Sequence, residues 1–319
     1  MKKIVWMFSG QGSQYFNMGR DLYEADAVFR EELARCDEAY GAARGSSLLN
    51  VIYPATKVGS DAVFDELRHT HPALFCLQYS LARTLLRRNH KPDLLLGYSL
   101  GEIVAAAVAG AMPFEAFLQV VMRQAEVLPS AAGPGGMLAV LAAPDSAGLD
   151  DPAFTGTAVA ARNFANHFVL SGALADIERA QLQLKAREIS TLRLPVPVAF
   201  HSPRLEVAKR AVKELVRDFQ MRELSIPLMS ASRVGLLEHL TPDFFWDVVR
   251  EPVRFADAVA WLEARGDYAY VDLGPSGTLA TFLKYVLPRS SGSSYHTTLS
   301  PYNRAVENLR NLEKIGAAV

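Results

Sequence analysis

Short apolar runs that end at glycine-rich turns alternate with helical patterns along much of the chain. Residues 4–8 and 94–96 are apolar throughout, as buried strands are. Leucines recur every three or four residues between positions 74 and 85, which is the spacing of one helix face. We predict strands at 4–8, 94–96 and 269–273, and helices at 73–87, 102–110 and 114–128. This alternation of strand, turn and helix predicts a parallel sheet covered by helices.

The middle of the chain has a different pattern, between a breaker cluster at 131–136 and the Pro-Val-Pro sequence at 195–197. We expect strands at 137–142, 158–162, 168–171 and 189–194, a helix at 175–187, and a further helix between the first two strands. Strands and helices in this order predict a small ferredoxin-like unit.

Composition narrows the class of protein. Half of the 319 residues are apolar, and 33 basic residues nearly balance 34 acidic ones. A disordered chain is therefore excluded, and nucleic acid is not an expected partner. The N-terminal apolar run is too short for a signal peptide, and no run approaches the roughly 18 residues of a membrane span. Cys36 and Cys76 are too few for a disulfide framework. We expect a cytoplasmic protein without membrane contact.

The turn after the second predicted strand carries the strongest chemical signal. Gly97-Tyr98-Ser99-Leu100-Gly101 matches G-x-S-x-G between an apolar strand and a helix. On such a turn a serine hydroxyl is held exposed above the helix N-terminus. The amide of Leu100 would then face the oxyanion that develops during acyl transfer. An ordinary turn or N-cap serine is the alternative, but the strand and helix on either side favour a nucleophile.

A nucleophilic serine needs a base, and the chain has seven histidines. His201 directly follows the apolar run 198–200. At the end of such a run, a strand tip would place the histidine in a cleft. The pattern alone leaves open that His201 is merely packed. His167 could line a cleft in the small unit. The other histidines lie at helix ends or in polar surroundings: His69, His71, His90, His239 and His296.

The first predicted strand ends at Ser9-Gly10-Gln11-Gly12-Ser13-Gln14. This segment lacks the lysine and the full spacing of a phosphate loop. It is either a surface loop or a source of backbone N–H donors at the carboxyl end of a strand, where open α/β sheets bind ligands.

Taken together, the motifs resemble those of the malonyl-CoA:acyl-carrier-protein transacylase family, which includes the free-standing acyltransferases of polyketide synthases. The resemblance runs along nearly the whole chain. It rests on residues 8–14, 70–74, 97–102, 135–137, 163, 169–172, 199–202, 252–255 and 274–275.

The resemblance implies a fold and a set of site residues. It implies an α/β-hydrolase-like subdomain of residues 1–130 and 198–319, with a ferredoxin-like subdomain of residues 131–197 inserted, and a site between them. Ser99 would be acylated and His201 would be its base. The amides of Gln11 and Leu100 would form the oxyanion hole. A main-chain carbonyl near Val248 would orient the histidine. Three further residues would reach the ligand: Asn163, His167 and Phe200.

Departures from the family pattern bear on specificity. The family usually has histidine at Tyr98 and glutamine at His71. Counted from Ser99 without gaps, the arginine that grips a malonyl carboxylate is replaced by Gln124. A gap of one residue would restore Arg123. Helical spacing favours Gln124, which shares the apolar stripe of the predicted helix 114–128, whereas Arg123 lies on its polar side.

A neutral glutamine gives a malonyl carboxylate no counter-charge, so the site should prefer non-carboxylated acyl groups. We therefore favour an acyl hydrolase that removes acyl groups from acyl carrier proteins of a polyketide synthase that lacks built-in acyltransferases. A coenzyme A-dependent acyltransferase and a catalytically silent carrier-protein-binding module are the alternatives. The substrate would be a phosphopantetheine or coenzyme A thioester. We expect no metal, no bound cofactor and a monomer.

Overall fold

The computed structural model describes residues 2–56, 59 and 62–317. A six-stranded sheet forms its centre, with the strands in the order β10-β9-β1-β2-β7-β8. All neighbours are parallel except β8, which runs antiparallel to β7. The strands are β1 (Lys3–Phe8), β2 (Leu94–Gly97), β7 (Leu228–Ser230), β8 (Gly235–Leu237), β9 (Tyr268–Asp272) and β10 (Ser294–Thr297).

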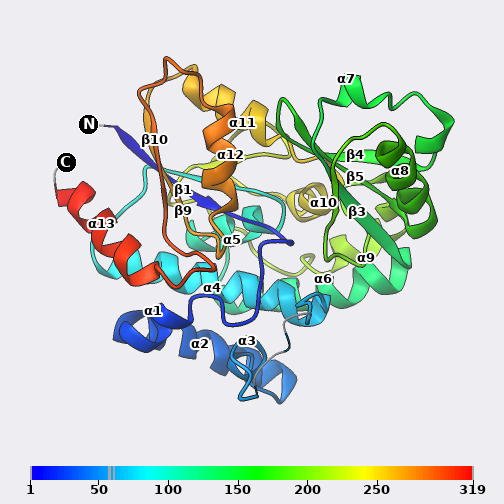
Figure 1. Ribbon diagram of the computed structural model, residues 1–319. Coiled ribbons are helices and arrows are strands. Elements are labelled where there is room, and N and C mark those ends of the chain that lie inside the picture. Colours follow the sequence, from blue (N-terminus) through cyan, green and yellow to red (C-terminus); the bar gives the residue numbers. More distant parts are fainter. Residues whose placement is uncertain (1, 57–58, 60–61, 318–319) are drawn as a thin grey trace.

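Alternate residues of β1 face two different cores. Trp6 and Phe8 belong to the core formed with α2 (Ala27–Arg44), α4 (Leu67–Arg87), α5 (Leu100–Val108) and α6 (Phe114–Ala132). Val5 and Met7 belong to the core formed with α11 (Phe255–Glu263) and α12 (Thr278–Val286). In Figure 1, α4 and α12 accordingly lie on opposite sides of β1. A strand buried on both faces has to be apolar throughout, which explains the sequence of this run.

A second, four-stranded sheet has the order β4-β5-β3-β6, and all its neighbours are antiparallel. Its strands are β3 (Gly135–Val140), β4 (Thr157–Phe164), β5 (His167–Ala173) and β6 (Thr191–Arg193). The short α7 (Pro144–Ala147) and η1 (Pro152–Phe154) join β3 to β4, and α8 (Leu174–Ala186) joins β5 to β6. This connectivity is ferredoxin-like. The unit has its own core, and β4 meets the large unit where Ala161 pairs with Val253.

The remaining elements lie around these two sheets (Figure 1). They are α1 (Arg20–Ala25), α3 (Leu49–Ile52), η2 (Pro203–Ala208), α9 (Lys209–Glu214), α10 (Pro242–Arg250) and α13 (Ala305–Ala317). Within the described ranges, no helix is both long enough and apolar enough to cross a membrane.

The prediction that a helix starts at residue 73 is wrong. Helix α4 begins at Leu67 and contains Pro72. Proline at the predicted boundary suggested a helix start, because proline favours first turns. Here it lies in the second turn and costs the helix one backbone hydrogen bond. The extension buries His71 inside the helix, and this proves important for the site.

Candidate active site

Ser99 lies on a strained turn between β2 and α5. Its backbone adopts φ 53° and ψ −124°, a region that non-glycine residues rarely occupy. Two glycines make the turn possible. A Cβ on Gly97 would overlap the backbone of Glu102, and one on Gly101 would overlap the carbonyl oxygen of Phe8. The turn therefore packs directly against β1, and Ser99 is presented at the N-terminus of α5.

His201 lies within hydrogen-bond distance of Ser99. The Ser99 Oγ to His201 Nε2 distance is 2.8 Å, and His201 Nδ1 lies 2.7 Å from the backbone carbonyl oxygen of Glu251. A carbonyl can only accept, so Nδ1 carries the proton and Nε2 is left to accept from the serine hydroxyl. His201 also has a positive φ of 58°, so both residues of the pair adopt rarely populated backbone conformations.

The carbonyl that orients His201 was expected near Val248, and this expectation is wrong. Val248 is buried within helix α10, where its carbonyl points along the helix. Glu251 is the residue that ends α10, so its carbonyl is free to turn toward the imidazole. The backbone N–H of His201 in turn donates to the carbonyl of Val249. The end of α10 thus fixes His201 at two points.

Burial sets the protonation state of His201. Desolvation lowers its pKa to about 4, more than the hydrogen bond to the Glu251 carbonyl opposes it. The imidazole is therefore neutral near pH 7 and can accept a proton. An acceptor beside a serine hydroxyl is the arrangement that nucleophilic catalysis requires.

The segment after β1 packs closely against the Ser99 turn. A Cβ on Gly10 would lie 2.7 Å from the Tyr98 carbonyl oxygen and 3.4 Å from the Leu100 nitrogen. Gln78 of α4 fastens the start of this segment: it accepts from the Ser9 N–H at 2.8 Å and donates to the Ser9 carbonyl at 3.0 Å. The backbone next to Gly10 is thereby brought up to the N-terminus of α5.

A small enclosed space, here called the inner cavity, adjoins Ser99. The room it leaves for the centre of a water molecule is about 10 Å³. Its lining combines predicted site residues with others that the sequence analysis left out: Gln11, His71, Ser99, Leu100, Ile103, Gln124, Phe200 and Val249.

Gln124 and Arg123 lie on different sides of α6. Gln124 is fully buried and lines the inner cavity. The Arg123 side chain is 62% exposed and lies 3.9 Å from Glu126. The inner cavity therefore receives a neutral amide from α6 and no guanidinium.

A larger space, the outer cavity, is lined by the segment 9–13. It has a volume of about 210 Å³ and runs between this segment, the small sheet and α12. Three of the residues that line it form a chain of hydrogen bonds. Tyr98 donates from its hydroxyl to Asn163 Oδ1 at 2.9 Å, and Asn163 Nδ2 donates to His167 Nδ1 at 2.9 Å. The predicted residues Asn163 and His167 thus share a cavity with Tyr98 and Gln11, next to the inner cavity.

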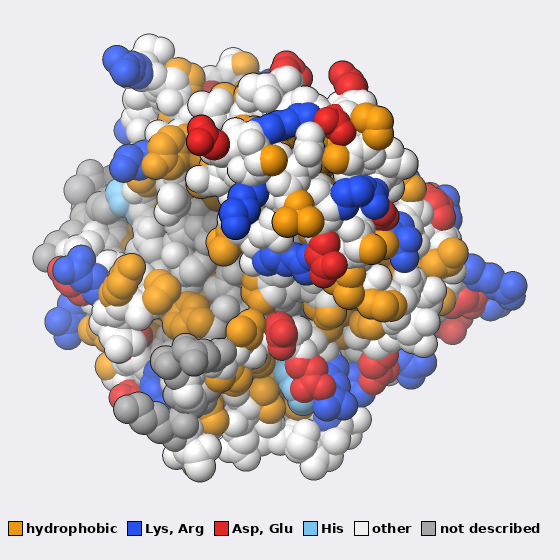
Figure 2. Space-filling view, turned by 45° about the vertical axis from the view of Figure 1, so that its right-hand side comes forward, with side chains coloured by type: hydrophobic (Ala, Val, Ile, Leu, Met, Phe, Trp, Pro, Cys, Tyr) orange, Lys and Arg blue, Asp and Glu red, His pale blue; other side chains and the backbone are white. Residues whose placement is uncertain are grey.

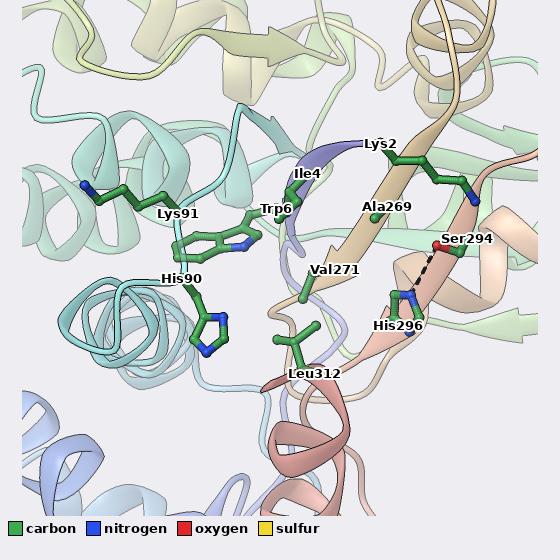
Figure 3. A pocket seen from close by; sticks show the side chains of 10 residues that line it. All are labelled: Lys2, Ile4, Trp6, His90, Lys91, Ala269, Val271, Ser294, His296 and Leu312. Carbon is green, nitrogen blue, oxygen red and sulfur yellow. Dashed lines mark hydrogen bonds between the residues drawn. The ribbon is translucent and has the colours of Figure 1, made fainter. Parts of the chain in front are cut away.

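A third cavity, of about 310 Å³, lies at the beginning of β1 and not at the end that leads to Ser99 (Figure 3). Apolar side chains of β1 and β9 form its wall, and Lys2, Lys91, His90 and His296 stand around it. His296 is hydrogen-bonded to Ser294 at 3.2 Å. This cavity contains none of the predicted site residues.

No group of three or more potential metal ligands is found in the part of the chain that the structure describes. On the face shown in Figure 2, Lys and Arg side chains are interspersed with Asp and Glu. Arg87 pairs with Glu31 at 2.8 Å and with Glu32 at 3.1 Å, so its charge is locally balanced.

Three residues that support the site were not identified from the sequence. Gln78 interrupts the leucine stripe of α4, and a lone polar residue on an apolar stripe could have revealed it. Glu102 is fully buried behind the turn, where burial raises its pKa to about 7 while the N–H of Ser232 donates to it at 2.9 Å. Glu251 contributes only a backbone carbonyl, for which a sequence offers no signal.

Comparison with known proteins identifies the family of this chain. The sequence profile of the family described as "Acyl transferase domain" matches residues 5–318 of this chain. The chain is 36% identical to the polyketide biosynthesis acyltransferase homolog PksD of Bacillus subtilis over 97% of its own length and 95% of that protein. It is equally similar, at 36%, to the homolog BaeD of Bacillus velezensis, with the same coverage.

A solved structure agrees with this result. A loading acyltransferase of the avermectin modular polyketide synthase superposes with a TM-score of 0.87 at 28% identity, covering 97% of this chain and 99% of that one. The predicted fold class, an α/β-hydrolase-like parallel sheet with an inserted ferredoxin-like unit, is confirmed by such neighbours.

Proposed function

Because this chain belongs to the acyl transferase domain family, we propose that it is a serine-dependent acyl hydrolase. It removes short, non-carboxylated acyl groups from the acyl carrier proteins of a polyketide synthase, through an acyl-Ser99 intermediate. The family relationship supports an acyl-enzyme and a polyketide context. The choice of hydrolysis and of neutral acyl groups is our inference from the site.

The observation that carries the proposal is the buried, uncharged Gln124 in the cavity beside Ser99. A malonyl carboxylate there would lose its hydration and gain no cation, at a cost of several kcal/mol. Arg123 cannot supply the charge from the exposed side of α6. An acetyl group carries no charge and so avoids this cost.

The proposed first half-reaction forms the acyl-enzyme. His201 Nε2 takes the proton from Ser99 Oγ, which attacks the thioester carbonyl carbon. The backbone N–H groups of Gln11 and Leu100 stabilise the oxyanion. The intermediate then collapses, the carbon–sulfur bond breaks, and His201 returns its proton to the leaving thiolate.

The second half-reaction regenerates Ser99. A water molecule enters where the thiol has left, and His201 takes its proton while its oxygen attacks the acyl carbonyl. The free acid leaves and the proton returns to Ser99 Oγ. A thiol in place of this water would give transfer instead, so hydrolysis and transfer share the same acyl-enzyme.

The outer cavity is the expected path for the thiol side of the substrate. At about 210 Å³ it has room for an extended arm, and amide and imidazole groups of Asn163 and His167 line it. His167 Nδ1 accepts from Asn163, so its Nε2 carries the remaining proton and can donate to a carbonyl of the arm. Such polar contacts suit the amide groups of phosphopantetheine.

The proposal is tested with carrier protein loaded with either acetyl or malonyl groups. We expect free acetate to be released from the acetyl form, and acylation of Ser99 by malonyl to be at least about tenfold slower than by acetyl. Mass spectrometry of the enzyme and of the carrier protein measures both steps. Acetyl transfer to a second, unloaded carrier protein without release of acetate would contradict hydrolysis and favour the acyltransferase alternative.

Two variants separate the roles of neighbouring residues on α6. Gln124→Arg should reverse or narrow the preference for acetyl, because a guanidinium can pair with the malonyl carboxylate. Arg123→Ala is the matched control and should change neither rate. Efficient malonyl acylation by the wild type that is lost in Arg123→Ala would overturn the assignment of Gln124.

A further inference from the structure

Unpartnered polar atoms are concentrated at the inner cavity. Among the described residues, four buried side-chain nitrogen or oxygen atoms have no hydrogen-bond partner. Three of them belong to residues that line this cavity: Gln11 Oε1, His71 Nδ1 and Gln124 Oε1. The fourth, Ser171 Oγ, lies in β5 of the small sheet. Buried polar atoms are nearly always satisfied, so three orphans at one cavity indicate a missing ligand atom.

The hydrogen-bonding capacity of these atoms defines the ligand. Gln11 and Gln124 each present an amide oxygen, which accepts. Their amide nitrogens already face other groups, Thr70 Oγ1 at 2.9 Å and the Phe245 carbonyl at 3.5 Å. His71 is neutral, because full burial lowers its pKa to about 3, so its Nδ1 takes or gives one hydrogen bond according to tautomer. The set therefore requires a ligand that can donate to an amide oxygen, and one that can also accept when His71 Nδ1 carries the proton.

The available space suits a terminal group about the size of one water molecule. The room for the centre of a water molecule, about 10 Å³, is close to the minimum of roughly 10–15 Å³ that a single water needs. A water molecule in a buried site makes about three hydrogen bonds. The three unpartnered atoms of the residues that line this cavity match this number.

We propose that the inner cavity binds a single uncharged hydroxyl group through Gln11, His71 and Gln124. The group is either an ordered water molecule or the hydroxyl of a short hydroxyacyl chain on Ser99. The second source rests on the proposed function, and the first does not. A water molecule can donate to both amide oxygens and accept from the Nδ1–H tautomer of neutral His71, whereas an acyl hydroxyl can accept from His71 and donate to one of the two amide oxygens.

Other chemistries fit less well. A carboxylate has only acceptor oxygens, which would oppose the two amide oxygens. A methyl group fits by size but leaves all three polar atoms unpartnered. His71 and Gln124 are also positions where the chain departs from the residues that the resemblance to the family leads us to expect. Both substituted residues thus line the same cavity and change which ligand groups it can bind.

The first arm of the test is a crystal structure of the unliganded wild-type protein at about 1.5 Å resolution or better. We expect one electron-density peak within hydrogen-bond distance of Gln11 Oε1, His71 Nδ1 and Gln124 Oε1. A crystal of Gln124→Met grown in the same form should lack this peak, because methionine keeps the length of the side chain but has no amide oxygen to accept the hydrogen bond. The wild-type crystal itself does not depend on the folding of any variant.

The second arm compares glycolyl and propionyl thioesters, which differ by a hydroxyl in place of a terminal methyl. If an acyl hydroxyl is the ligand, the wild type should be acylated at least about tenfold faster by glycolyl than by propionyl. Gln124→Met should bring this ratio close to one. Ser171→Ala removes the orphan atom outside the cavity and should leave the ratio unchanged.

The outcomes separate the two sources from failure. A density peak with equal glycolyl and propionyl rates assigns the site to water. A glycolyl preference that Gln124→Met abolishes assigns it to an acyl hydroxyl. Absence of both, or an equal loss of preference in Ser171→Ala, overturns the proposal. Fast malonyl acylation would instead refute the proposed function, and it would leave the wild-type density peak as a valid test of the water site.

Discussion

The inner cavity, which Ser99 lines, and the outer cavity, which the preceding residue Tyr98 lines, differ in size and in how their polar groups are hydrogen-bonded. The inner cavity has room for about one water molecule, and three of its polar atoms have no partner. The outer cavity is about 210 Å³, and its polar residues Tyr98, Asn163 and His167 are hydrogen-bonded to each other. The first is suited to a small group that completes its hydrogen bonds. The second is a preformed channel that can admit an extended ligand.

The difference explains how departures from the family pattern act. On the outer side, the resemblance to the family leads us to expect histidine at Tyr98, and Asn163 Oδ1 accepts a hydrogen bond from the Tyr98 hydroxyl at 2.9 Å. That change is compensated within the protein. On the inner side, His71 and Gln124 replace the expected glutamine and arginine, and neither is compensated. A ligand that supplies the missing hydrogen-bond partners should therefore bind more tightly than one that does not. We accordingly expect the inner cavity to govern which acyl groups are accepted.

The largest expected effect is at Ser99, which lines the inner cavity, and at His201, whose Nε2 lies 2.8 Å from Ser99 Oγ. Ser99→Ala should abolish the acyl-enzyme, because no oxygen remains to be acylated. His201→Ala should slow acylation by about 10²–10⁴-fold, because the proton acceptor is lost. Intact mass after incubation with acetyl thioester measures both. An acyl adduct on Ser99→Ala would show that Ser99 is not the nucleophile. Near-normal acylation of His201→Ala would show that another residue acts as the base.

The pH profile of acylation provides the next effect. Only neutral His201 can accept the serine proton, and burial lowers its pKa to about 4 from 6.5. The kcat/KM for acetyl thioester should therefore stay nearly constant from pH 8 down to about 5 and fall near pH 4. A histidine of ordinary pKa would already have lost about 30-fold at pH 5. Circular dichroism at each pH controls for unfolding, and a midpoint near 6.5 in folded protein would contradict the burial argument.

Much of the fold could be predicted because burial dictates the residue pattern. The apolar runs at 4–8 and 94–96 are β1 and β2, since a strand covered on both faces must be apolar throughout. The order of strands and helices in the middle of the chain corresponds to the antiparallel second sheet. Boundaries were less predictable where local signals mislead: Pro72 suggested a helix start, yet α4 begins at Leu67.

The site was predictable where side chains carry a motif or a helical phase. The G-x-S-x-G turn pointed to Ser99, and the phase of one helix distinguished Gln124 from Arg123. Two features could not be foreseen. The Glu251 carbonyl belongs to the backbone, and every residue has one. The burial of His71 depends on α4 packing beside Phe200, whose ring centre lies 5.6 Å from that of the imidazole, a contact between distant parts of the chain.

A smaller effect should follow from widening the inner cavity. Phe200 is buried and forms part of its wall. Phe200→Ala should raise the ratio of butyryl to acetyl acylation by about tenfold, because the removed ring leaves space for further methylene groups. The ratio is measured within one variant, so loss of folded protein cancels. An unchanged ratio would show that Phe200 does not limit chain length.

The smallest effect should come from the outer cavity and should leave acyl choice untouched. Tyr98→Phe removes the hydroxyl that donates to Asn163 Oδ1, and Asn163 is almost completely buried. The lost hydrogen bond is worth about 1 kcal/mol, or about fivefold. Because Asn163 also donates to His167, both groups should hold the thiol arm less firmly.

We therefore expect the KM for acetyl-pantetheine to rise about fivefold in Tyr98→Phe, with kcat little changed. The KM for a thioester of a short thiol that does not reach the outer cavity should stay the same and serves as the control. The ratio of butyryl to acetyl acylation should also stay at its wild-type value, unlike in Phe200→Ala. If Tyr98→Phe altered that ratio as strongly as Phe200→Ala does, the two cavities would not act independently, because a change on the thiol side would then reach the acyl pocket through the turn that carries Ser99.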